Sequence, residues 1–125
     1  MIVKCISLSI ASKKDSEAQT QEVVELDIGR DYLVHCVDIN PQEGAKYYVS
    51  PSQEWHFPPP YQSELFEIVC SNIPDGWRIH IGQPVDEGVS VRVAPDYWFE
   101  FPDFYERLVD GDPDAMEIFS LHRNR

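Results

Sequence analysis

Histidine and cysteine, the side chains best suited to acid–base, nucleophilic or metal chemistry, are few and scattered in this chain of 125 residues. The histidines are His35, His56, His80 and His122, and the cysteines are Cys5, Cys36 and Cys70. No Cys-x-x-Cys pair occurs, and no histidine stands at the spacing of a structural zinc site. The sequence therefore predicts no metal site and no cofactor.

A complete set of residues for nucleophilic catalysis is also missing. Cys36 could act with a histidine from a neighbouring strand, but no glycine-rich turn accompanies it to stabilise an oxyanion. His35 and Asp38 are three positions apart on a predicted strand, which places them on opposite faces. The chain contains no phosphate loop, no dinucleotide fingerprint and no Gly-x-Ser-x-Gly motif. We predict no catalytic residue and no enzymatic activity.

The three cysteines all lie in apolar runs of the sequence. Free cysteine behaves as a small buried hydrophobe, and reduced thiols are typical of cytoplasmic proteins. We therefore expect three buried, reduced thiols in a protein of the cytoplasm. The short, quickly polar N-terminus and the lack of a long apolar run argue against a secretion signal or a membrane span.

The aspartates at positions 110, 112 and 114 have the alternation of a calcium-binding loop. Such a loop needs glycine at its sixth position and glutamate at its twelfth, where this chain has Ala115 and Leu121. Pro113 also interrupts it. The pattern instead indicates a glycine helix stop followed by an aspartate that caps a second helix.

The segment from residue 96 to residue 117 is both acidic and aromatic. Its eight carboxylates are accompanied by a single basic residue, Arg107, and by a series of aromatic side chains. Disordered acidic tails lack such apolar residues, so this segment should fold and present a dense negative surface. We predict that this surface contacts a basic protein partner through Asp96, Glu100, Asp103, Glu106, Asp110 and Asp114.

A second candidate contact surface is the loop at residues 51–61, which contains four prolines. Prolines restrict the backbone, and Trp and Tyr are common at the energetic centres of interfaces. Trp55, Phe57 and Tyr61 are therefore predicted partner-binding residues. The alternative is that the loop is a rigid lid over one end of the β structure.

The net charge of −12 restricts the classes of ligand. Nucleic acid and anionic membrane surfaces both attract clustered Lys and Arg, whereas the ten basic residues here are almost all isolated. We predict that neither is a direct ligand.

The elements that would position these residues are mostly short strands. Apolar and turn patterns predict strands near residues 2–10, 24–28, 32–39, 46–50, 65–69, 77–81 and 89–93, with a bulge near residue 35. Residues 11–21 and 82–88 are predicted loops, and residues 40–44 a hairpin loop. Trp77 and Trp98 are predicted core residues.

Two short helices are expected after the strands, the first with Pro102 at its first position and the second capped by Asp112. Phe104, Leu108, Met116 and Phe119 would face inward. The chain is predicted to be mainly β (α+β): a small antiparallel barrel or twisted sheet of about six strands with two short C-terminal helices. We expect one domain, with β structure at residues 2–94 and the acidic, aromatic helical segment at 95–121.

Three stretches carry a family resemblance: LDIGRDYLV at residues 26–34, FEIV with IPDGW at 66–77, and DFYERLVDGD at 103–112. The β part looks like a Src-homology-3-like barrel, in which a glycine turn leads into a Tyr-x-Val strand. Over residues 24–121 the chain is similar to immunity proteins of polymorphic toxin and contact-dependent inhibition systems of bacteria. The resemblance implies a non-enzymatic protein that neutralises a basic toxin, such as a nuclease domain, and it transfers no catalytic residue. The alternative is a small β-barrel module of a larger bacterial assembly, with the charge serving solubility.

Overall fold

The computed structural model describes residues 1–11, 20–82 and 90–124, which form ten strands, three α-helices and one 3-10 helix. The strands are β1 (Ile2–Cys5), β2 (Ser9–Ala11), β3 (Thr20–Glu22), β4 (Asp31–Leu33), β5 (Cys36–Asn40), β6 (Gly44–Tyr48), β7 (Pro60–Gln62), β8 (Phe66–Cys70), β9 (Trp77–Ile81) and β10 (Val91–Pro95). The helices are the 3-10 turn Ser63–Leu65, α1 (Tyr97–Glu100), α2 (Phe104–Val109) and α3 (Pro113–His122). Most of the two loops predicted at 11–21 and 82–88 lies outside the described residues.

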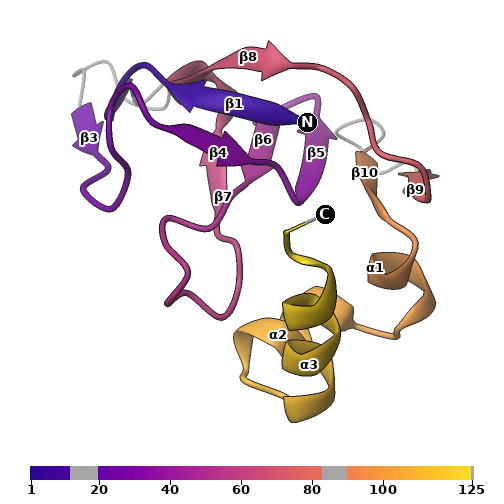
Figure 1. Ribbon diagram of the computed structural model, residues 1–125. Helices are drawn as coiled ribbons and strands as arrows, with labels where there is room; N and C mark the ends of the chain where they lie inside the picture. The colour runs from indigo at the N-terminus through magenta and orange to yellow at the C-terminus, as the bar shows by residue number, and fades with distance from the viewer. Residues whose placement is uncertain (12–19, 83–89, 125) are drawn as a thin grey trace.

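The strands pair in antiparallel sheets that stay open within the described residues. A five-stranded sheet has the order β7-β6-β5-β10-β9, a three-stranded sheet has the order β4-β1-β8, and β2 pairs with β3. The helices gather together beyond the strands (Figure 1). The predicted mainly β, α+β class is confirmed. Of the two predicted architectures, the twisted-sheet form is found, and the closed barrel is not.

The chain changes sheet at Val34 and His35, both of which are buried. The sequence predicts one strand at residues 32–39 with a bulge here. Instead, β4 ends at Leu33 in the three-stranded sheet and β5 begins at Cys36 in the five-stranded sheet. The predicted bulge is therefore wrong: the reversal of apolar parity is caused by a crossing between two sheets.

The five-stranded sheet has a separate apolar cluster on each face. On one face, Tyr47 and the partly buried Val37 pack with Val3, Phe66 and other residues associated with the three-stranded sheet. On the other face, the cluster comprises Cys36, Tyr48, Ala94, Trp98, Phe104, Leu108, Ala115 and Phe119. The second cluster draws residues from β5, β6 and β10 and from all three helices. The C-terminal helices are thus packed on the sheet by their aromatic side chains.

The predicted strand at residues 24–28 is wrong. Leu26 is buried, but Val24 and Ile28 are 80% and 64% exposed, and no strand forms there. The hydroxyl of Tyr32 accepts a hydrogen bond of 2.8 Å from the Asp27 N–H, so the backbone bonds to a side chain instead of a neighbouring strand. One buried leucine is enough to anchor this connection.

Strand β9 forms where predicted, but it is an edge strand and is not half-buried. Ile79 and Ile81 are 69% and 64% exposed, and Trp77 is only half-buried, which corrects its assignment to the core. Val91 of β10 pairs with both Ile81 and Ile39. The apolar row of β9 therefore continues across the sheet, beyond the part covered by the three-stranded sheet.

The C-terminal helices differ from prediction mainly at their starts. Helix α1 was not predicted, and α2 begins at Phe104, after a turn that includes Pro102 and an Asp103 with φ of 54°. Gly111, with φ of 81°, ends α2 as expected. Asp112 caps α3 by accepting hydrogen bonds from the backbone N–H groups of residues 114 and 115.

The inward faces of the helices are mostly as predicted. Phe104, Leu108 and Phe119 are 1% exposed or less. Trp98 is also buried, as predicted. Met116, however, is 37% exposed, because Ala115 takes the buried position one residue earlier.

Candidate functional site

The predicted acidic surface lies on the three C-terminal helices and the turns between them. Glu100, Asp103, Glu106, Asp110 and Asp114 are all exposed. Within the part of the chain that the structure describes, four of these five carboxylates form no ion pair, the exception being Glu100. The helices therefore present negative charge that the basic residues in the described ranges do not neutralise.

Asp96 and Glu100 form a separate group, because both bind Arg78 of strand β9. The Arg78 Nε lies 2.7 Å from Asp96 Oδ1, and its terminal nitrogen lies 3.1 Å from Glu100 Oε1. These two carboxylates fix α1 to the edge of the sheet. They have less negative charge to offer a partner than the other predicted residues.

Asp112, which was left out of the predicted contact set, has a structural role. It binds Arg107 at 2.7 Å and caps α3. The hydrogen bond from Arg107 is the main reason that the pKa of Asp112 is lowered, and the backbone N–H groups of the cap add to the effect. Asp112 thus holds α2 and α3 in their relative positions.

The acidic helices are supported by a tightly packed aromatic layer. The Trp98 and Tyr105 rings are stacked, with centres 5.5 Å apart and an angle of 15° between their planes. Tyr48 of the sheet meets both rings edge-on, at 5.7 Å and 5.1 Å. Such aromatic pairs stabilise packing beyond the burial of apolar area alone. They therefore hold the helices that carry the carboxylates in fixed positions on the sheet.

The loop at residues 51–61 does not offer the predicted aromatic contact surface. Tyr61 is 6% exposed, and its hydroxyl donates a hydrogen bond of 3.0 Å to Glu25, so it offers a partner little surface. Trp55 and Phe57 are half-buried and pack edge-to-face at 5.8 Å. Phe57 also lies against Tyr105 of α2.

Hydrogen bonds hold this loop to the C-terminal helices and to Arg123, which directly follows α3. The Tyr105 hydroxyl donates to the Pro58 carbonyl at 3.0 Å, and Arg123 donates to the Trp55 carbonyl at 3.1 Å. His56 Nε2 lies 3.1 Å from the Val109 carbonyl oxygen. The alternative prediction, a rigid lid over one end of the structure, describes these contacts better than an open contact surface.

A cleft of about 670 Å³ separates the five-stranded sheet from the segment at residues 98–106. One wall comes from β5, β6 and β10, and the other carries Trp98, Phe101, Tyr105 and the predicted contact residues Asp103 and Glu106. The sequence did not indicate this cleft, because its lining comes from segments that are far apart in the chain. The polar residues at positions 38, 46, 80 and 92, which alternate with apolar residues on strands that pair, were the one signal in the sequence that could have indicated its sheet wall.

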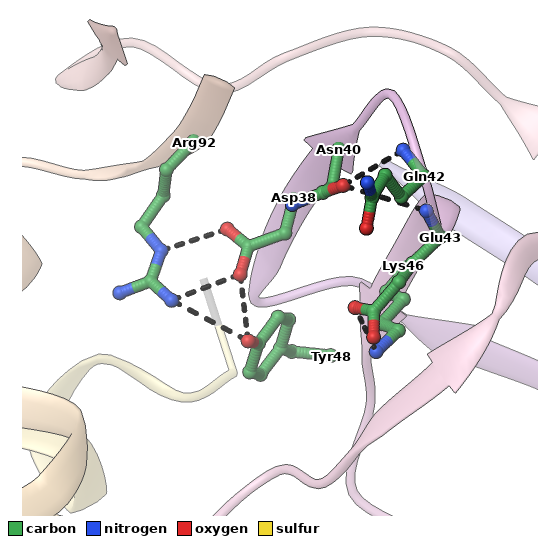
Figure 2. Close-up of polar contacts among 7 residues, drawn as sticks. All are labelled: Asp38, Asn40, Gln42, Glu43, Lys46, Tyr48 and Arg92. Atoms are coloured by element: carbon green, nitrogen blue, oxygen red, sulfur yellow. Dashed lines mark hydrogen bonds and ion pairs between the residues drawn. The ribbon is translucent and has the colours of Figure 1, made fainter. Parts of the chain in front are cut away.

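A network of three polar side chains forms part of the sheet wall of the cleft. Arg92 binds Asp38 with two nearly parallel hydrogen bonds, of 2.7 Å from Nε and 2.9 Å from a terminal nitrogen. The Tyr48 hydroxyl donates to the second Asp38 oxygen at 2.7 Å (Figure 2). Antiparallel pairing places Asp38 opposite Arg92, which brings the two charges together. Bidentate pairs of this kind are the strongest hydrogen bonds in proteins.

The network shifts the pKa values of its members in the expected directions. Burial alone would raise the pKa of Asp38, but hydrogen bonds from Arg92 and Tyr48 outweigh burial and lower it. Burial, followed by the hydrogen bond to Asp38, raises the pKa of Tyr48. Asp38 and Arg92 therefore both stay charged, and Tyr48 stays protonated, at neutral pH.

The neighbouring turn completes this wall. The Asn40 side chain accepts hydrogen bonds from the backbone N–H groups of Gln42 and Glu43 at 2.8 and 3.4 Å (Figure 2). Lys46 binds Glu43 at 2.9 Å. Gly44 has φ of 75°, so the predicted hairpin loop at residues 40–44 is confirmed.

The cysteines lie apart from any cluster that could bind a metal. Cys5 and Cys36 are fully buried, but Cys70 is half-buried, which corrects the prediction of three buried thiols. Burial, and then the nearby Asp38, raise the pKa of Cys36, while burial raises that of Cys5. Raised pKa values and burial both make a thiol unreactive.

We expect a thiol reagent to label Cys70 of the native protein quickly and the other two cysteines only after unfolding. Mass spectrometry of peptides after timed alkylation with iodoacetamide would assign each site. Labelling in denaturant provides the control for complete reaction. Equal rates at all three cysteines in the native protein would contradict the burial described here.

In the described ranges, no three His, Cys, Asp or Glu residues converge as metal ligands would. None of the described helices has the length and apolar character needed to cross a bilayer. Comparisons with protein-family models, with curated proteins and with solved structures find no match. The arguments about function that follow therefore come from the chain itself.

Proposed function

We propose that this chain is a non-enzymatic protein-binding protein that neutralises a basic toxin, such as a nuclease domain, through its acidic helical surface. The observation that carries the proposal is the set of exposed carboxylates on α2, α3 and the turns beside them that form no ion pair with the described residues. A nuclease must present Lys and Arg to grip phosphates, and a surface of this kind can occupy the same patch. The three free thiols favour the cytoplasm as the place of action.

Electrostatics would act mainly on the rate of association. Complementary charges steer two proteins together and raise the association rate, and salt screens this attraction over about 8 Å at physiological ionic strength. The firm aromatic layer beneath the carboxylates supports binding as well, because a prearranged surface loses little entropy on association.

The proposal predicts that a toxin gene lies beside the gene for this chain. The test produces that toxin together with either the wild type or a charge-reversal variant. The variant carries Glu106→Lys, Asp110→Lys and Glu117→Lys, all at exposed helical or helix-end positions. Asp103 is left unchanged, because its positive φ would strain a lysine. We expect the variant to lose protection of the cell, and the wild-type complex to form more slowly as salt rises.

A matched variant separates the location of the charges from their number. Glu64→Lys, Glu67→Lys and Asp75→Lys alter three exposed carboxylates outside the helices and change the net charge equally. This variant should still protect. If both variants protect as well as the wild type while keeping the same unfolding temperature, the acidic helical surface is not the interface.

A second candidate function, an interaction module of a larger assembly, is favoured by the exposed apolar row on strand β9. Ile79 and Ile81 lie on an edge strand, and adding a partner's strand to such an edge is a common mode of recognition. The double variant Ile79→Lys, Ile81→Lys distinguishes the two functions. It should keep toxin binding under the first proposal and abolish assembly under the second.

A further inference from the structure

The two walls of the cleft differ in whether their charges are neutralised. On the sheet wall, Arg92 is bound by Asp38 and Lys46 by Glu43. On the helical wall, Asp103 and Glu106 have no such partner among the described residues, and both are exposed. Among the residues that the structure describes, four carboxylates and two cations line the cleft, so the excess charge of this lining is negative and lies on the helical wall.

The same helical wall carries aromatic rings, which attract cations through their faces. Trp98, Phe99, Phe101 and Tyr105 all line the cleft. Attraction of a cation to an aromatic face is strongest where the site is partly shielded from water. The planar guanidinium of arginine also stacks on rings, which the compact ammonium of lysine does not do.

The molecule already binds arginine in this manner at two places beside the cleft. The guanidinium carbon of Arg107 lies 4.2 Å from the centre of the Phe101 ring, while its nitrogens bind Asp112 at 2.7–2.8 Å. Arg92 lies 5.9 Å from the centre of the Trp98 ring while its nitrogens bind Asp38. Arg92 also lies 5.7 Å from the centre of the Tyr48 ring, so each arginine is held by a carboxylate together with aromatic rings.

We propose that the cleft receives an arginine side chain of the basic partner, which is bound by the Glu106 and Asp103 carboxylates and stacked on the aromatic wall. The inference rests on the proposed function and specifies its contact. An anionic group would meet cations that are already paired and two carboxylates that are not. The cleft volume of about 670 Å³ is in the range of ligand pockets, so the whole side chain fits.

The paired network in Figure 2 explains why this site stays open to a partner's arginine. Arg92 cannot swing across to Glu106 without giving up its two hydrogen bonds to Asp38 and its contact of 3.4 Å with the Tyr48 hydroxyl. Lys46 is similarly held by Glu43. Arg92 and Lys46 are therefore kept on the opposite wall.

The experiment titrates the isotope-labelled protein with three blocked tripeptides, Gly-Arg-Gly, Gly-Lys-Gly and Gly-citrulline-Gly, while amide and indole signals are followed by NMR. Citrulline has the shape of arginine without its charge. We expect the arginine peptide to give saturable shifts at the Trp98 indole and at the amides of residues 99–106. The lysine peptide should bind more weakly, and the citrulline peptide should give no saturable shift.

Two variants of the cleft carboxylates and their controls complete the experiment. Glu106→Gln should weaken arginine-peptide binding about tenfold, the effect of removing one charge-assisted hydrogen bond. Asp103→Asn should act in the same direction, and asparagine tolerates the positive φ at this position. Glu67→Gln and Asp31→Asn alter exposed carboxylates on the three-stranded sheet and should leave the affinity unchanged.

A third variant tests the aromatic wall. Phe101→Leu keeps an apolar side chain but removes the ring, so it should reduce the preference for arginine over lysine. Circular dichroism of each variant checks that the fold is retained. If Phe101→Leu lowers stability, the preference is measured on the folded fraction below its unfolding transition.

The outcomes separate this inference from the proposed function, because the tripeptide titration needs no toxin. Equal binding of the arginine and citrulline peptides, or shifts spread over all surface carboxylates, would overturn the inference. If Glu106→Gln and Asp103→Asn also leave toxin affinity unchanged while the triple reversal abolishes it, the acidic surface is the interface and the cleft is not part of it.

Discussion

Replacing Arg92 with methionine is expected to destabilise the protein by about 3 kcal/mol, the lower end of the range for removing one partner of a buried ion pair. The Arg92 and Asp38 side chains are 32% and 27% exposed, so water screens their attraction only in part. The variant leaves the Asp38 carboxylate with Tyr48 and the Cys36 thiol as its remaining hydrogen-bond donors. Urea unfolding at neutral pH would measure the change.

The destabilisation caused by Arg92→Met should become smaller as the pH falls. This pH dependence would identify the Asp38 carboxylate as its cause. Arg92→Met removes the strongest influence that lowers the pKa of Asp38, so we expect burial to raise that pKa against the remaining hydrogen bonds from Tyr48 and Cys36. A group whose pKa is raised by folding is destabilising when it is ionised, and it stops being so once the pH falls through the raised pKa. The double variant Arg92→Met, Asp38→Asn should accordingly recover much of the lost stability at neutral pH.

Arg78→Met provides the matched control, because Arg78 forms an equally short ion pair on the surface. Its Nε lies 2.7 Å from Asp96, but the two side chains are 56% and 39% exposed. Exposed pairs contribute at most about 1 kcal/mol, so this variant should cost far less than Arg92→Met. Similar losses in the two variants would show that burial of the Asp38–Arg92 pair contributes no extra stability.

The fold class was predictable because it depends on local signals. Turn residues such as Gly44 and Gly111, and the cap at Asp112, specify backbone geometry within a few positions of themselves. These were located correctly. The break near His35 was also detected, but whether a break is a bulge or a crossing between sheets depends on which distant strand pairs next.

Burial was predicted less well on the strands than on the helices. Ile79 alternates with polar residues just as a half-buried strand residue does, but it lies on the edge strand where no layer covers it. Alternation shows which residues share a face, and a second layer decides whether that face is buried. The same limitation explains Val24 and Ile28, which flank a single buried leucine.

The candidate site was predicted in composition but not in arrangement. The carboxylates of the C-terminal segment could be named from the sequence. Their separation into three groups could not be predicted: two bind Arg78, two line the cleft, and the others lie on the open surface. Asp38, Tyr48 and Arg92 come from three strands. Their association requires the strand order β6-β5-β10, which no local pattern specifies.

His35 should make the protein less stable in mild acid, because burial beneath helix α3 disfavours its charged form. Burial, with a smaller contribution from the charge of Arg123, lowers the pKa of His35 from 6.5 to about 4. Its ring meets Phe119 of α3 edge-on at 5.1 Å. In the unfolded chain the same imidazole binds a proton near pH 6.5, so acid favours unfolding.

The contribution of neutral His35 to the stability of the protein is complete above pH 6.5, and it is lost as the pH falls toward 4. Between pH 7 and pH 4.5 the loss from this one group is about 2.5 kcal/mol, by linkage of protonation to folding. The lowered pKa of Asp38 also makes the protein less stable in acid, but only below pH 3.8, the pKa of this carboxyl in the unfolded chain. The two effects therefore fall in different pH ranges.

The variant His35→Leu separates the histidine from all other titrating groups. Leucine is apolar and similar in size, so it should remain packed against Phe119 and Arg123. The variant should be about as stable at pH 4.5 as at pH 7, apart from the stability lost through protonation of carboxylates. Urea unfolding of both proteins at the two pH values gives the difference directly. If wild type and variant lose the same stability between pH 7 and pH 4.5, His35 is protonated in the folded protein and the helix packing above it is looser than described.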